Sequence, residues 1–375
     1  MSAARGLEMA VDDPLVPRRR DETLAGMLAR RGVSRRALLK VAAALASLMA
    51  LPPAAAREMA DGLARARRQA VIWLSFQECT GCTESLTRAH GPTLESLIFD
   101  FISLDYHHTL QAASGEAAEA ARLQSMRDNK GSYIVVVDGS VPVADGGVYS
   151  MIAGRSNVDI LAETVADAAA VVAVGTCASF GGLPSADPNP TGAVAIADLV
   201  EGKPVVNIPG CPPVPEAMAG TIAHLLAFGA LPELDALGRP RSFFGETIHD
   251  RCYRRPFYER GMFAKRFDDE GARQGWCLFE VGCKGPVTYN ACATLKWNGG
   301  TSFPIQSGHG CLGCSEPGFW DRGSFYRPLS AATGSHRATV GMAAVGGVAA
   351  GAAAARLARQ RRDSNPSGDV NREPA

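Results

Sequence analysis

The sequence predicts an α/β protein in which a parallel sheet domain, residues 71–238, precedes a smaller irregular domain, residues 239–330. Short apolar segments alternate with helical patterns, such as those near Glu116–Met126 and Val158–Ala168, and this alternation is typical of a parallel sheet. After about residue 235 the chain becomes rich in Gly, Pro, aromatic residues and Cys. Such a segment has a poor apolar core, so we expect metal sites to organise it. The expected strands are Val71–Phe76, Ile98–Leu104, Tyr133–Val137, Val171–Val174 and Val205–Ile208.

Length and charge narrow the possible classes of protein. A chain of 375 residues can hold two domains and a sizeable core. Its 38 Lys and Arg residues balance its 38 Asp and Glu residues, so the charge does not indicate a nucleic-acid partner.

Residues 1–56 have the pattern of an export signal. Ser34–Lys40 contains an arginine pair, the apolar run Val41–Leu51 follows, and small residues stand at Ala54–Ala56. The apolar run is too short to span a bilayer and suits the core of a signal. The arginine pair resembles a twin-arginine signal, although Leu38 stands where Phe is common. The alternative is a basic amphipathic helix that has no targeting function. Residues 57–70 are expected to be a connector.

The C-terminal region contains an uncharged stretch, residues 338–355, made mostly of Ala, Gly and Val. As a helix it is about 27 Å long, which barely crosses a bilayer core. The polar tail 356–375 begins with several arginines, which favours a cytoplasmic end and puts the domains on the export side. We therefore expect a transmembrane anchor; a flexible low-complexity tail is the alternative.

The ten cysteines fall into three groups with the size and spacing of iron–sulfur sites. An exported chain with an even cysteine count also allows disulfides. Two features argue against them: the chain is large enough to fold without disulfides, and the twin-arginine route carries proteins already folded in a reducing cytoplasm. The groups are Cys79, Cys82, Cys177 and Cys211; then His249, Cys252, Cys277 and Cys283; then Cys292, Cys311 and Cys314.

The first group is defined by its position in the expected sheet. Cys79, Cys177 and Cys211 each follow an expected strand, and Cys82 comes three residues after Cys79. Parallel strands end at one edge of the sheet, where open α/β sheets bind ligands. Cys79-x-x-Cys82 alone also fits a thioredoxin-type redox pair, and four thiolates also fit zinc. The other two groups favour iron–sulfur clusters.

The second group includes a histidine, and the third has only three cysteines. His249 lies three residues before Cys252, in a group that otherwise has three ligands, and an imidazole ligand raises a cluster potential. In the third group, Pro304 lies where a fourth ligand could stand, which suits a three-iron cluster. His309 is the competing fourth ligand.

These segments together resemble the small subunit of a nickel–iron hydrogenase of the exported, membrane-anchored uptake type. The resemblance covers about residues 70–328, the leader and the anchor. It is specific, because all ten cysteines and the histidine match in order. The matching segments are Glu78–Ser85, Gly175–Ala178, Pro209–Pro213, His249–Cys252, Gly282–Pro286 and Gly310–Cys314.

The resemblance implies a flavodoxin-like sheet domain and three clusters in a row. The first group would hold a proximal 4Fe–4S cluster, the third a medial 3Fe–4S cluster and the second a distal 4Fe–4S cluster. Hydrogen chemistry would occur at the nickel–iron centre of a partner large subunit. Electrons would leave to a membrane cytochrome b or to a ferredoxin-like, quinone-linked subunit, on the periplasmic side of the cell membrane.

The chain departs from oxygen-tolerant members of this family at two positions. Those members carry two extra cysteines around the proximal cluster, and Gly81 and Gly182 stand there in this chain. We therefore expect an ordinary proximal cluster and oxygen-sensitive activity. Glu78 and Glu84 flank the first cysteine pair; Glu84 is expected to favour the start of the following helix, and a proton-transfer role for Glu78 stays open.

Overall fold

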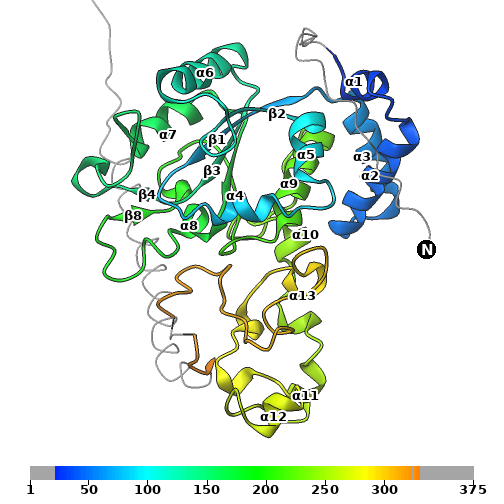
Figure 1. Cartoon of the computed structure of the whole chain (residues 1–375), viewed down its shortest axis with the longest axis vertical. Coiled ribbons are helices and arrows are strands. Elements are labelled where there is room, and N and C mark those ends of the chain that lie inside the picture. Colours follow the sequence, from blue (N-terminus) through cyan, green and yellow to red (C-terminus); the bar gives the residue numbers. More distant parts are fainter. Residues whose placement is uncertain (1–21, 323–324, 330–375) are drawn as a thin grey trace, which may run out of the picture.

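The computed structural model describes residues 22–322 and 325–329, and its first domain is built on a parallel sheet (Figure 1). The sheet order is β2-β1-β3-β7-β9, and every neighbouring pair is parallel. Counted along the chain, this is the order of flavodoxin-like sheets. The strands are β1 (Gln69–Ser75), β2 (Ile102–His107), β3 (Ile134–Asp138), β7 (Ala170–Val174) and β9 (Val205–Ile208). Two short pairs lie outside the sheet: β4 (Val141–Pro142) with β8 (Ala193–Val194), and β5 (Met151–Ile152) with β6 (Arg155–Ser156).

Alternate residues of the strands enter two apolar cores, one on each face of the sheet. In β1, Val71 and Trp73 join one core, whereas Ile72 and Leu74 join the other. This follows from the period of two along a strand, and it explains why strands covered on both faces are continuously apolar. The helices α6 (Gly115–Asp128), α7 (Asn157–Val165) and α8 (Gly175–Phe180) line one core, and α4 (Gly81–Leu86) and α9 (Pro215–Phe228) line the other.

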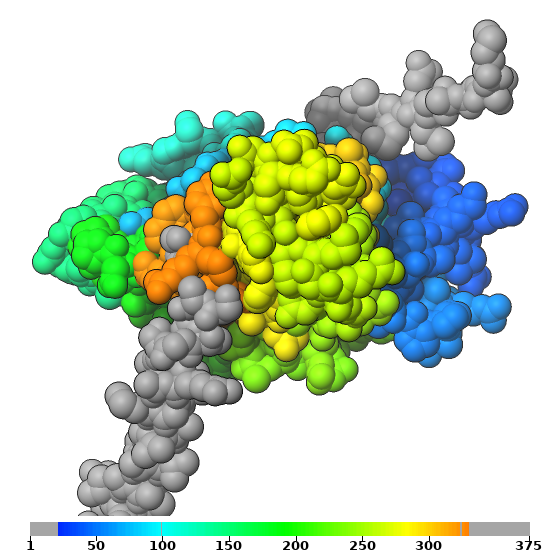
Figure 2. Space-filling model, turned by 90° about the horizontal axis from the view of Figure 1, so that it is seen from below, coloured from blue at the N-terminus to red at the C-terminus, as the bar shows by residue number. Residues whose placement is uncertain are grey.

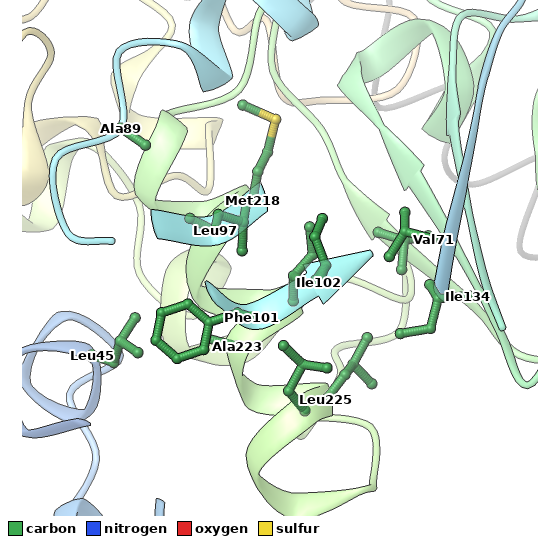
Figure 3. Close-up of a cluster of buried hydrophobic side chains, with 14 of the residues drawn as sticks. Leu45, Val71, Ala89, Leu97, Phe101, Ile102, Ile134, Met218, Ala223 and Leu225 are labelled. Carbon is green, nitrogen blue, oxygen red and sulfur yellow. The ribbon is translucent and has the colours of Figure 1, made fainter. Parts of the chain in front are cut away.

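Helix α9 is the most deeply buried helix against the sheet. It begins with Pro215, which suits the first helical turn, and ends at Gly229 with φ +61°. Figure 3 shows Met218, Ala223 and Leu225 of this helix in the core with Phe101 and Ile102. Complete burial of a side chain such as Ile222 contributes about 1.5–3 kcal/mol.

The second expected strand begins later than the alternating pattern predicts. Residues 98–101 belong to a helical turn instead, formed by α5 (Leu94–Ser96) and the π-helical segment Leu97–Phe101. The reason is local: the Thr93 side chain accepts a hydrogen bond from the Ser96 N–H and caps the turn. The strand then starts at Ile102.

The described part of the expected leader and connector folds into three helices against the sheet domain. They are α1 (Leu24–Arg30), α2 (Arg35–Leu48) and α3 (Pro53–Arg65), at the blue end of Figure 1. Leu45 of α2 is fully buried in the core shared with α9. A Cβ on Gly62 would stand 1.9 Å from the Ala227 carbonyl oxygen, so α3 and α9 meet at backbone distance. The segment 57–70, which we expected to be a connector, therefore contains most of the packed helix α3 and the first residues of β1.

The smaller domain has only short helices around its own apolar cluster. They are α10 (Arg241–Phe244), α11 (Arg255–Glu259), α12 (Glu270–Arg273) and α13 (Cys292–Leu295), with 3₁₀ turns between them. Its core includes the thiols of Cys283 and Cys292 beside Ile248, Leu278 and Phe303. Phe243 and Phe244 pack into the sheet domain's core, although the predicted boundary puts them in the second domain.

The expected anchor, residues 338–355, lies outside the described residues. Within residues 22–322 and 325–329, no helix has the length and apolar character needed to cross a bilayer.

Candidate iron–sulfur centres

The structure brings the four cysteines of the first group to the carboxyl edge of the sheet. Cys79 follows β1, Cys177 lies in α8 directly after β7, and Cys211 follows β9. Cys82 lies in α4, which begins after Thr80 in the left-handed region at φ +65°. The Thr176 N–H donates to the Gly210 carbonyl at 2.9 Å, which places the loops that carry Cys177 and Cys211 side by side. The expected convergence of strand ends is therefore present.

Three glycines leave room for these sulfurs. A Cβ on Gly175, at φ +84°, would stand 2.5 Å from the Cys82 Sγ. A Cβ on Gly182 would stand 2.7 Å from the Cys177 Sγ, and one on Gly81 would stand 3.2 Å from the Cys79 Sγ. The two positions that distinguish oxygen-tolerant proteins in the resemblance thus lie directly against candidate ligands.

The second group lines a small pocket in the smaller domain. His249, Cys252, Cys277 and Cys283 all face it, together with the apolar side chains of Leu278, Phe279, Pro286 and Ile305. Burial lowers the pKa of His249, which favours the neutral imidazole that a metal ligand requires. The ring of Tyr258 packs edge-on against the ring of His249, with 4.6 Å between the ring centroids, and this contact restricts the orientation of the imidazole.

The third group lies between the first two. Cys292 begins α13, and its thiol donates to Asn290 Oδ1 at 3.1 Å. The Gly313 N–H donates to the Cys311 Sγ at 3.4 Å. His309, the competing fourth ligand, stacks on Phe267 at 5.8 Å and contacts Tyr326 edge-on.

Direct hydrogen bonds connect the three groups. The Thr176 hydroxyl, next to Cys177, donates to the Cys314 carbonyl, which links the first group to the third. The Cys311 N–H donates to the Cys283 Sγ at 3.3 Å, which links the third group to the second. The spatial order is therefore first, third, second, although the order along the chain is first, second, third.

The chemistry of the thiols favours metal binding over disulfides. All ten cysteines are free. Burial and neighbouring thiols raise the pKa of Cys177 to about 11, and of Cys211 and Cys292 to about 12. A cationic metal centre offsets this cost, because a coordinated thiol is deprotonated outright.

The spacing of these side chains differs from that of a single-ion site. Among the residues that the structure describes, no three His, Cys, Asp or Glu side chains are placed to hold a single metal ion. A cubane cluster carries its thiolates on separate irons and so holds them farther apart than one ion does.

Sequence reasoning missed a buried polar network behind the first group. Asp138, at the end of β3, is buried, and burial raises its pKa to about 7. Its Oδ2 is buried without a hydrogen-bond partner, and the neighbouring Thr83 Oγ1 lies 3.3 Å from the His107 Nε2. Its position directly after a valine-rich strand was the available signal, because that edge is where ligands bind.

Two further residues that the sequence did not single out join the domains. Thr176 Oγ1 donates to the Cys314 carbonyl and accepts the Gly210 N–H at 2.9 Å. The buried Arg239 bridges Asp235 at 2.7 Å and Glu316 at 3.0 Å. Neither residue has a distinctive spacing, so only the packing identifies them.

The two flanking glutamates differ. Glu84 forms an exposed ion pair with Arg88 at 2.7 Å, in keeping with an ordinary surface helix. Glu78 accepts a hydrogen bond from Thr80, and its Oε2 is buried without a partner. Burial raises the pKa of Glu78.

Known protein families match both domains. Residues 244–327 match the family model of the C-terminal part of NiFe/NiFeSe hydrogenase small subunits, and residues 79–225 match "NADH ubiquinone oxidoreductase, 20 Kd subunit". The chain is similar to a solved structure of the Ni-Fe-Se hydrogenase from Desulfomicrobium baculatum, at 36% identity and a TM-score of 0.66. That match covers 70% of this chain and 100% of the other.

Curated relatives extend over nearly the whole chain. The uptake hydrogenase small subunit of Azotobacter vinelandii is 47% identical over 337 residues, which cover 89% of this chain and 94% of that protein. The Hydrogenase-1 small chain of Escherichia coli strain K12 is 42% identical over 362 residues, which cover 94% and 97%. With its three connected cysteine groups, the chain therefore belongs to the family of nickel–iron hydrogenase small subunits, uptake type.

Proposed function

We propose that this chain conducts electrons from hydrogen oxidation in a large subunit, through two 4Fe–4S clusters and one 3Fe–4S cluster, to a membrane acceptor. The observation that carries the proposal is the continuous line of candidate ligands, linked by Thr176, beside Cys177, to Cys314 and by Cys311 to Cys283. The small subunits of hydrogenases hold iron–sulfur clusters and pair with a large subunit that has the nickel–iron centre.

Each of the three groups of candidate ligands would hold one cluster along this line. Cys79, Cys82, Cys177 and Cys211 would hold the proximal 4Fe–4S cluster. Cys292, Cys311 and Cys314 would hold the medial 3Fe–4S cluster, and His249, Cys252, Cys277 and Cys283 the distal 4Fe–4S cluster. Bound clusters supply one-electron transfer.

The two ends of the line have different surroundings. Cys79 and Cys211 are exposed in this isolated chain, so the first group lies where a large subunit would cover it. At the other end, His249 is half-buried, and its neutral ring favours a higher potential than a thiolate does. Both features fit entry of electrons at the sheet edge and exit from the smaller domain.

We further propose export by the twin-arginine leader and anchoring through residues 338–355, with the domains on the periplasmic side. The acceptor is then a membrane cytochrome b or a ferredoxin-like, quinone-linked subunit. Positive charge after residue 355 supports this orientation.

The first test is chemical analysis of the iron and acid-labile sulfide content of the anaerobically purified heterodimer. An electron paramagnetic resonance (EPR) spectrum of the same sample accompanies it. We expect about eleven irons from this chain, in addition to the iron of the nickel–iron centre, and the near-isotropic signal of an oxidised 3Fe–4S cluster. Zinc in place of iron, or no metal at all, would contradict the proposal.

A further inference from the structure

The smaller domain has a group of touching aromatic rings on its surface. Phe267 packs against His309 at 5.8 Å and against Tyr326 at 5.7 Å, and Trp320 packs against Phe325 at 4.9 Å. The ring centroids of Phe325 and Tyr326 lie 6.4 Å apart and connect these two sets of rings. We name these residues the aromatic surface: Phe267, His309, Trp320, Phe325 and Tyr326.

The aromatic surface is unusually exposed for such side chains. Phe267 is 47% exposed, Trp320 is 44% exposed and Tyr326 is 58% exposed. Contiguous exposed aromatic groups mark interaction surfaces, because the free energy falls when each ring is removed from water. In Figure 2 the orange segment 300–329 lies beside the yellow-green segment of the same domain, on the face turned away from the sheet.

The end of the described chain passes through this surface and packs against a candidate ligand loop. A Cβ on Gly282 would stand 2.5 Å from the Phe325 carbonyl oxygen and 2.6 Å from the Tyr326 Cα. Lys284 Nζ donates to the Arg327 carbonyl oxygen. Residues 325–327 are therefore held against the loop that carries Cys283.

Chain length limits how far the aromatic surface can lie from a bilayer. Residues 330–337 separate the described chain from the expected anchor, and a fully extended segment of that length spans at most about 30 Å. An anchored protein thus keeps the aromatic surface close to the membrane. This step rests on the proposed anchor.

The side-chain types, together with the short distance to the proposed anchor, favour lipid as the occupant. Tyr and Trp prefer the membrane–water interface, where the ring is apolar and its polar atom remains hydrated. The exposed Lys265 and Arg322 lie beside the rings in sequence, and long cationic side chains extend to lipid headgroups from such positions, whereas Arg266 pairs with Asp268 at 3.6 Å. We propose that the aromatic surface rests in the headgroup region of the bilayer and so holds the Cys283 loop at the membrane.

Photocrosslinking of the complete heterodimer in its own membranes tests this proposal. p-Benzoylphenylalanine is placed at Tyr326 in one variant and at Phe267 in another. The matched control carries it at Tyr149, a 49% exposed tyrosine of the sheet domain. After illumination, we expect a phospholipid adduct at Tyr326 and Phe267, and none at Tyr149.

Two results would overturn the proposal. A crosslink from Tyr326 and Phe267 to a second polypeptide would show a protein docking surface, and the absence of any adduct would show a surface in water. Alkaline carbonate extraction, run in parallel, separates this failure from that of the anchor. A protein that carbonate removes contradicts the proposed anchor, whereas one that stays in the membrane without a lipid adduct contradicts only the aromatic surface.

Discussion

The hydroxyl of Thr176 donates a hydrogen bond to the backbone carbonyl of Cys314, across the junction of the two domains. The same hydroxyl accepts the Gly210 N–H at 2.9 Å, so it ties Cys314 to the loop that precedes Cys211. The first and third cysteine groups are thereby held in a fixed relation. The distance between these two groups of candidate ligands then depends on a few hydrogen bonds that join the domains, and these can be removed one at a time.

Replacing Thr176 by Val should loosen this junction. The change leaves a buried N–H and a carbonyl without partners, at a cost of about 1–3 kcal/mol for each unpaired group. We expect a lower melting temperature and an altered magnetic interaction between the first and third centres in EPR spectra. Thr221→Val is the control, because the Thr221 hydroxyl bonds only to Ala217 within its own helix. Equal effects in both variants would contradict a special role for Thr176.

Replacing Gly175 by Ala should remove iron from the first site. The new Cβ would meet the Cys82 Sγ at 2.5 Å, and the left-handed backbone adds about 1 kcal/mol of strain. Gly202→Ala has the same kind of backbone, at φ +71°, but no atom within 4 Å. We expect iron analysis to show a loss of about four irons for Gly175→Ala and none for Gly202→Ala. Full iron content in both variants would refute the assignment.

Hydrogen oxidation by the purified complex should be lost under air. Gly81 and Gly182 lie directly against the sulfurs of Cys79 and Cys177 and offer no thiol there. The measurement is hydrogen-dependent dye reduction before and after exposure to air, with an aliquot kept anaerobic as the control. Activity that persists in air would contradict this prediction.

Replacing Arg239 by Met should destabilise the protein far more than replacing its neighbour Arg241. The Arg239 side chain is 5% exposed and pairs with two carboxylates, so its loss leaves buried charge uncompensated and costs about 3 kcal/mol. Arg241 is 58% exposed, and its pair with Glu233 is worth about 1 kcal/mol at most. Chemical unfolding of the two variants, measured anaerobically, gives the comparison. Similar losses would mean that Arg239 has no special role at the domain junction.

Acid should weaken the protein through His107. Burial and the nearby charge of His108 lower the pKa of His107 to about 4, below the usual 6.5. The unfolded chain then binds a proton that the folded chain excludes, so stability is complete above about pH 6.5 and falls as the pH drops toward 4. The full effect is about 3 kcal/mol. His107→Gln should flatten the melting temperature between pH 7 and 5; an unchanged slope would assign the effect to other groups.

Much of the fold could be predicted because its signals are local. The apolar segments around Val135 and Val172 are continuous, and such segments indicate strands that are buried on both faces. The start of β2 could not be predicted in this way, since the alternation of residues 98–104 competes with the cap supplied by Thr93. The packing of α2 and α3 on α9 also escaped prediction, because small residues such as Gly62 do not by themselves indicate a close helix contact.

The sequence by itself determined the three groups of candidate ligands and the position of Cys79, Cys177 and Cys211 at strand ends, because spacing and strand order are written along the chain. The resemblance to a family implied their order in space. Only the tertiary structure decided how the third group is joined to the other two, through the Thr176–Cys314 and Cys311–Cys283 hydrogen bonds, and which buried residues support them. The physical reason is that these contacts join segments far apart in sequence, and only the packing of two domains brings their hydrogen-bonding groups together.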